Sequence, residues 1–130
     1  MTIRPESKHR QRLLVPYQQA SVSANTSALL WGTTSAEYRS FRLTSVWLNP
    51  TGSLAASGTD YWTVAITDGT NTLASFSTAA NALSTNTPVF LALQTNHDLP
   101  PAGTLELVLT TTGSPSALPA FRVVCDGEVL

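Results

Sequence analysis

Cysteine is almost absent from this sequence: of its 130 residues, only Cys125 is a cysteine. A single thiol excludes an intrachain disulfide and any metal site built from a cysteine cluster. The fold must therefore be stabilised by an apolar core, and a chain of this length can bury roughly two-thirds of its unfolded surface. The sequence predicts one folded domain that needs neither a disulfide nor a metal ion, with Cys125 as a small buried apolar residue.

Charged residues are also scarce, because they make up 12% of the chain, about half the average share in globular proteins. Serine and threonine together fill about a quarter of the sequence. Threonine suits the exposed face of a pleated sheet. The composition therefore predicts a β-rich protein whose surface carries hydroxyl groups more than charges.

Long apolar runs are missing as well. No stretch approaches the roughly 18 residues that a membrane-spanning helix needs, and no apolar segment follows the charged N-terminus as in a secretory signal. We expect a soluble chain that does not contact a membrane.

The few charges are unevenly distributed. Basic side chains are concentrated in the first twelve residues, where Glu6 is the single acid, so this segment carries a net +3 while the rest carries −4. These basic residues are Arg4, Lys8, Arg10 and Arg12. Because the segment has no periodic apolar pattern, the sequence predicts an extended arm over 1–12 and a folded domain over 13–130.

The clearest local structure is a β-hairpin over 60–77. Trp62, Val64 and Ile66 occupy every second position, which is the period of a strand that buries one face. Asp68-Gly69 then provides residues that tolerate positive φ in a tight turn. A weaker return strand, which could be an edge or end strand, follows over 72–77.

Six further strands are expected along the chain, at 13–15, 28–31, 38–49, 87–94, 105–110 and 121–125. Pro16 suits an edge position for the first of them. In the segment 38–49 the apolar residues change parity around Ser45, which predicts either a bulge there or burial of both faces. In the last strand Arg122 and Val124 are expected to face outward, and Asp126-Gly127 is expected to end it. The alternating apolar residues of the last two strands are expected to face inward: Leu105, Leu107, Leu109, Phe121, Val123 and Cys125.

Turn residues separate these strands, and no segment has the length or the periodicity of a helix. The sequence therefore predicts an all-β fold, an antiparallel β-sandwich or jelly roll of about eight strands. We expect Trp47 and Trp62 in its core, where substitution of either by alanine would cost roughly 3 to 5 kcal/mol.

No arrangement of residues indicates catalysis. His9 lies in the arm and His97 beside Asp98, without a neighbouring nucleophile. Four of the scattered acids are expected at strand ends or turns, where aspartate binds the backbone: Asp60, Asp68, Asp98 and Asp126. A glycosidase site, in which two carboxylates face each other across a cleft, is not excluded by the sequence, but no feature of the sequence favours it.

Cofactor and metal sites are not indicated either. The segment 68–71 loosely resembles a calcium loop but lacks the terminal glutamate, and no glycine-rich phosphate loop occurs. We expect a protein that is not an enzyme and that holds neither a metal nor a cofactor.

The basic arm has two open interpretations. It lacks interleaved aromatic residues and precedes an acidic domain, so direct nucleic-acid binding is not expected. Arg4, Lys8, Arg10 and Arg12 would instead bind an acidic surface of a partner protein, or the arm is a solvated tail without a function.

Residues 60–124 resemble the small β-sandwich decoration, or cement, proteins of tailed-bacteriophage heads. The resemblance depends on Tyr61-Trp62, the segment Ala102-Gly103-Thr104-Leu105-Glu106-Leu107, and the turn Thr112-Gly113-Ser114-Pro115. It implies a virion protein on the outer capsid surface, often a homotrimer, that clamps neighbouring major capsid subunits.

The alternative interpretation is a carbohydrate- or receptor-binding β-sandwich module, for example of a phage tail protein. Five aromatic residues could form a platform on which sugars stack, namely Trp31, Tyr38, Trp47, Tyr61 and Trp62. This interpretation requires exposed aromatic side chains and a measurable affinity for a glycan.

Overall fold

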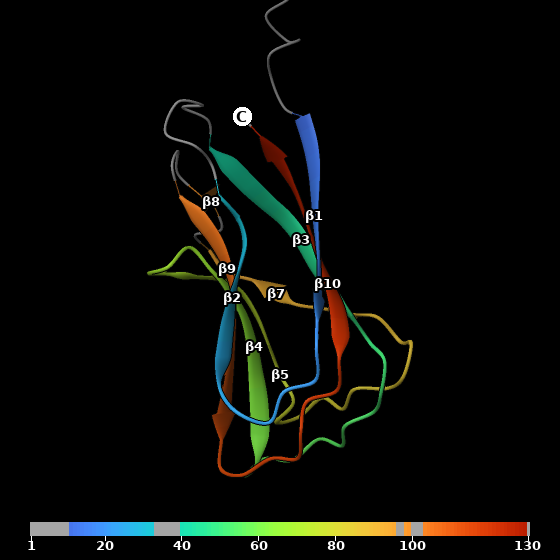
Figure 1. The fold of residues 1–130 in the computed structure, drawn as a ribbon. Coiled ribbons are helices and arrows are strands. Elements are labelled where there is room, and N and C mark those ends of the chain that lie inside the picture. Colours follow the sequence, from blue (N-terminus) through green and yellow to red (C-terminus); the bar gives the residue numbers. More distant parts are fainter. Residues whose placement is uncertain (1–10, 33–39, 96–97, 100–102, 130) are drawn as a thin grey trace, which may run out of the picture.

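The computed structural model describes residues 11–32, 40–95, 98–99 and 103–129 (Figure 1). Within these residues it contains ten strands in two antiparallel sheets and no helix, hence none that could cross a membrane. The first sheet consists of β1 (Gln11–Gln19), β10 (Phe121–Val129), β3 (Phe41–Pro50), β6 (Val89–Phe90) and β8 (Asp98–Leu99). The second consists of β2 (Thr26–Gly32), β9 (Thr104–Thr112), β4 (Tyr61–Thr67), β5 (Thr72–Ser77) and β7 (Ala92–Leu93). The predicted all-β sandwich is confirmed.

The strand order interleaves the two ends of the chain. In the first sheet the order is β1-β10-β3-β6, with β8 also beside β3, and in the second it is β2-β9-β4-β5-β7. The last strand is therefore inserted between the first and the third, and β1 starts where β10 ends (Figure 1). This order is that of a jelly roll.

The core lies between the sheets and is made by the alternating residues that the sequence singles out. Trp62, its largest member, is fully buried and donates its indole N–H to the carbonyl oxygen of Ser116 at 2.8 Å. The other alternating residues named for the hairpin strand and the last two strands are also buried: Val64, Ile66, Leu105, Leu107, Leu109, Phe121, Val123 and Cys125. The predicted inward faces of β4, β9 and β10 are confirmed.

A bulge in β3 changes which side of the strand faces the core. Gly127 of β10 lies opposite Leu43 whereas Asp126 lies opposite Ser45, so Thr44 is the extra residue of β3. Leu43 is buried before the bulge and Val46 after it. Of the two alternatives expected near Ser45, a bulge or burial of both faces, the structure has the bulge.

The same bulge corrects the expectation for Trp47. With the parity shifted by one residue, Trp47 lies on the outer side of the sheet and is half-buried, whereas its neighbours Val46 and Leu48 are fully buried. The prediction that Trp47 belongs to the core is wrong, because a pattern read with a strict period of two cannot include an inserted residue.

The strand predicted over 87–94 is divided between the sheets. Val89–Phe90 pairs with β3 in the first sheet, and Ala92–Leu93 pairs with β5 in the second. Leu91, between them, is buried and donates its backbone N–H to Val46 O at 2.9 Å. Because apolar residues occupy both parities here, the sequence does not reveal where the chain crosses between the layers.

The terminal strands are longer than expected. β1 begins at Gln11, so Gln11 and Arg12 of the predicted arm belong to the sheet, and β10 continues through Gly127 to Val129. Nine residues of each strand pair with the other, and this long-range pairing has no local signal. β1 is an edge strand, as Pro16 predicts.

Candidate interaction surface on the first sheet

The outer face of the first sheet carries a row of charges near the end where β1 starts. Arg12, Glu128, Arg42 and Asp98 lie in register across β1, β10, β3 and β8. Arg12 Nη2 is 2.8 Å from Asp126 Oδ2, and Arg42 Nε is 2.9 Å from Asp98 Oδ1. Each guanidinium makes a second hydrogen bond to the same carboxylate. These hydrogen bonds raise the pKa of Arg12 and of Arg42 above the ordinary value of an arginine.

An apolar row crosses the same face farther along the strands. Pro16, Val124, Trp47 and Phe90 are in register across β1, β10, β3 and β6, and Leu14 adjoins them on β1; these five residues are the apolar stripe. Phe90 is 67% exposed and Leu14 47% exposed. The rings of Trp47 and Phe90 lie 6.3 Å apart and tilted by 56°. Exposed apolar side chains gathered in one patch are typical of an interaction site.

A groove of about 360 Å³ lies within the stripe, lined by Leu14, Pro16, Trp47, Asn49, Arg122 and Val124. Val124 is only 9% exposed and comes from β10, the strand between those that carry Pro16 and Trp47. Val124 therefore forms the base of the groove, and the side chains of β1 and β3 form its walls.

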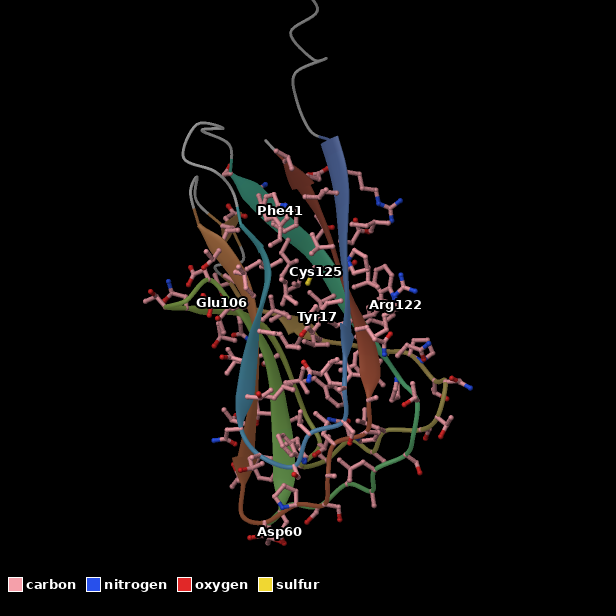
Figure 2. All side chains as sticks on the ribbon, in the orientation of Figure 1. Tyr17, Phe41, Asp60, Glu106, Arg122 and Cys125 are labelled. Carbon is pink, nitrogen blue, oxygen red and sulfur yellow. The ribbon has the colours of Figure 1, made fainter. Side chains whose placement is uncertain are left out.

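Two polar residues, Arg122 and Asn49, lie opposite each other in the register at one end of this groove. Arg122 is exposed, and Figure 2 shows it on the outer side of the sheet, whereas Cys125 lies between the layers. The guanidinium of Arg122 has no hydrogen-bond or ion-pair partner among the described residues. Asn49 Oδ1 is shielded from solvent and receives no hydrogen bond from the described residues.

The outer face of the second sheet differs in chemistry. Most of its rows consist of small and hydroxylated residues, such as Thr110-Thr63-Ser77 and Val108-Ala65-Ser75. Leu29, an isolated exposed apolar residue, lies beside Glu106. Glu106, labelled in Figure 2, is its charged member among the described residues. All three described arginines lie on the first sheet instead. The hydroxyl-rich surface predicted from composition is thus this second face, and the features suited to recognition lie on the first.

The residues predicted to bind a partner are mostly outside the described part of the chain, namely Arg4, Lys8 and Arg10. Arg12 is described, but it belongs to β1 and its guanidinium is paired with Asp126. The role of the basic arm stays a prediction.

The acids divide into two groups. Asp60 Oδ1 accepts the backbone N–H of Ser114 at 2.8 Å, and Asp68 Oδ1 accepts the N–H of Asn71 at 2.6 Å. These hydrogen bonds hold the pKa of both carboxyls below its usual value. The predicted backbone role is confirmed for Asp60 and Asp68, whereas Asp98 and Asp126 pair with arginines instead.

Catalytic and metal chemistry gains no support from the arrangement of the described residues. They include no group of three histidine, cysteine or acidic side chains able to hold a metal ion, and His9 and His97 lie outside them. Cys125 is buried as predicted, and burial raises its pKa to about 12, so the thiol stays protonated at neutral pH.

The three tryptophans considered for a sugar platform are not brought together. Trp62 is in the core, Trp31 of β2 packs on Phe41 with ring centroids 5.2 Å apart, and Trp47 is on the outer face of the first sheet. Tyr38 lies outside the described residues. The sequence alone does not predict the outer face of the first sheet as an interaction surface, because this face depends on the bulge and on strand pairing. The one local signal for it is the outward parity of Arg122 and Val124.

Comparison with known proteins places the chain in no family. No family model matches it, and no curated protein sequence matches it. The structure is similar to a chain in the solved structure of infectious bursal disease virus, Gx strain, with 10% sequence identity and a TM-score of 0.34. The match covers 99% of this chain and 42% of that chain, so this chain spans about two-fifths of its length. A TM-score this low does not establish a shared fold.

Proposed function

We propose that this chain is a structural virion protein, a decoration or cement protein that binds the outer surface of a phage head and clamps neighbouring major capsid subunits. One observation carries the proposal: the apolar stripe and Arg122 form an exposed face suited to recognition on the outer side of the first sheet. Apolar, aromatic and arginine side chains are the residues that dominate protein interfaces. The role requires binding without catalysis.

The position of the arm fits attachment at two points. Residues 1–10, which contain Arg4, Lys8 and Arg10, immediately precede β1, and β1 contributes Leu14 and Pro16 to the stripe. Because the arm and part of the apolar stripe belong to the same end of the chain, they would contact neighbouring parts of the capsid. Two linked contacts bind more tightly than either alone, because the second becomes intramolecular.

The resemblance of residues 60–124 to phage decoration proteins supports the same assignment. It implies a homotrimer on the outer capsid surface, with the major capsid protein as partner. In a trimer each copy would contact the next through two different patches, a contact that closes into a ring.

Co-sedimentation with capsids tests the proposal. Deleting residues 1–10 should leave the sandwich folded, since β1 begins at Gln11, but should weaken attachment and reduce its dependence on salt. A deletion through Arg12 is less informative, because it also removes the ion pair with Asp126. Full-length protein that fails to sediment with capsids at low salt would refute the function, and undiminished binding of the truncated protein would refute the role of the arm.

A carbohydrate- or receptor-binding module is the second candidate function, and the exposure of Trp47 and Phe90 favours it. Aromatic faces suit the apolar faces of sugars. A glycan array separates the two functions: specific glycan binding that is lost in Trp47→Ala would support the module, and an array without hits would count against it.

A further inference from the structure

Arg122 is the arginine whose guanidinium has no partner among the described residues. Arg12 and Arg42, on the same face, each make two hydrogen bonds to one carboxylate, whereas Arg122 stands exposed beside the groove. A guanidinium binds a carboxylate in preference to neutral groups, because the hydrogen bonds are charge-assisted and paired. The occupant of the groove therefore carries an acidic group.

Asn49 lies beside Arg122 in the register, at the same end of the groove. Its Oδ1 is shielded from solvent, so this oxygen is not open to a ligand in the groove. The group that the polar end of the groove offers to an acidic occupant is therefore the guanidinium of Arg122.

The rest of the groove favours a protein segment over a sugar. Leu14, Pro16 and Val124 have no side-chain hydrogen-bonding group, so a saccharide there would leave most of its hydroxyl groups without partners. An aliphatic or aromatic side chain needs no hydrogen-bond partners, so it could pack on Val124 at the base of the groove and on the side chains of β1 and β3 that form its walls. About 360 Å³ is at the lower end of ligand-site volumes and suits one or two side chains.

A second copy of this chain does not meet these requirements. The described acids already have partners within the chain: Asp126 is held by Arg12, Asp98 by Arg42, Asp60 by Ser114, Asp68 by Asn71 and Glu106 by Thr104. Glu128 lies in register with Arg42 and helps to raise its pKa. None of the described acids is therefore left to pair with Arg122 of another copy, and we assign the complementary charge to a different protein.

We propose that the groove between β1 and β3 binds an extended segment of a partner protein in which an apolar anchor side chain lies close to an aspartate or glutamate. The anchor packs on Val124 between Pro16 and Trp47, and the carboxylate pairs with Arg122. Val124 and Arg122 are two residues apart on one strand, about 6.6 Å. In an extended partner this spacing separates the anchor and the acid by one residue. The inference rests on the proposed function, in that it assumes a protein partner.

A random peptide library displayed on phage, selected against the full-length protein, tests the groove without any capsid. Wild-type protein should enrich peptides in which an apolar residue and an acid are one to three positions apart. Arg122→Gln should weaken binding of the selected peptides about tenfold, the effect of losing one charge-assisted hydrogen bond. Arg42→Gln, which removes the same charge from the same face outside the groove, should change binding by less than about twofold.

The charge-reversed variant gives the sharpest result. Arg122→Glu should select peptides in which lysine or arginine replaces the acid beside the same apolar anchor, while Trp47→Ala should lose the preference for the anchor. Circular dichroism of each variant shows that the sandwich is intact. The proposal would be overturned if the wild-type protein enriched no peptides, or enriched apolar peptides without acids. It would also be overturned if Arg122→Glu enriched the same acidic peptides, or if the protein bound a glycan and Trp47→Ala abolished that binding. None of these outcomes bears on attachment to capsids through the arm, which co-sedimentation measures separately.

Discussion

At the scale of single residues, Trp62 and Trp47 show how burial follows the side of the sheet on which a residue lies. Trp62 is enclosed between the sheets and its indole N–H is hydrogen-bonded to Ser116 O. Trp47 is half-buried against Phe90 on the outer face. The first ring stabilises the core, and the second is available for recognition.

Alanine substitutions separate these two roles. Trp62→Ala should lower the free energy of unfolding by roughly 3 to 5 kcal/mol, because it leaves a cavity and an unpaired carbonyl. Trp47→Ala, which removes a half-exposed ring, should cost only about 1 kcal/mol. Urea titrations of both variants measure the difference. Equal shifts of the two midpoints would contradict the assigned positions of the rings.

At the scale of elements, the bulge in β3 determines the character of the recognition face. Thr44 is the inserted residue, and its hydroxyl donates to Asp126 O at 2.9 Å, which fixes the bulge against β10. Without the insertion, the parity of β3 would turn Trp47 inward and Val46 outward. The bulge therefore supplies both a continuous core and the aromatic wall of the groove.

Gly127 is the position on β10 that this bulge requires. A Cβ there would lie 2.5 Å from the carbonyl oxygen of Arg42 and would also meet the ring of Phe41. Gly127→Ala should therefore destabilise the protein by about 1 to 3 kcal/mol, the usual cost of overpacking. Thermal or urea unfolding measures the effect.

Gly58→Ala is the matched control, since a Cβ at Gly58 would meet nothing within 4 Å. Its effect should stay within about 0.5 kcal/mol. If Gly127→Ala proved as harmless as Gly58→Ala, the close packing of β10 against β3 would be refuted.

At the scale of the whole molecule, the strand order ties the two ends of the chain together. β10 lies between β1 and β3, so the first sheet cannot form before the last strand is present. Strand pairs so distant in the sequence must close long loops before they gain stabilising contacts. Each sheet is therefore assembled from strands of both halves of the chain.

This topology predicts slow folding. Refolding from urea, followed by tryptophan fluorescence in a stopped-flow instrument, should have its main phase between about 1 ms and a few seconds. A phase of tens of seconds caused by isomerisation at the eight prolines should disappear in double-jump experiments, which serve as the control. A main phase faster than 1 ms would be inconsistent with the observed strand order.

The sequence by itself determined the fold class and the local geometry. Alternating apolar residues predicted the inward faces of β4, β9 and β10, and the Asp68-Gly69 turn is present, with Gly69 at φ +93°. These features depend on neighbours in sequence, so a local pattern is sufficient to reveal them. The change of parity around Ser45 indicated either a bulge or burial of both faces, and the register with β10 shows that it is the bulge.

Only the tertiary structure decided which surface is suited to recognition. Pairing with distant strands determines the side on which Trp47 lies, the crossing of the chain at Leu91 and the start of β1 at Gln11. Arg122, Asn49 and Leu14 meet for the same reason, since three strands far apart in sequence bring them to one groove. Charge and exposure become a recognition site only when strand register places them together, and register is a property of the folded sheet.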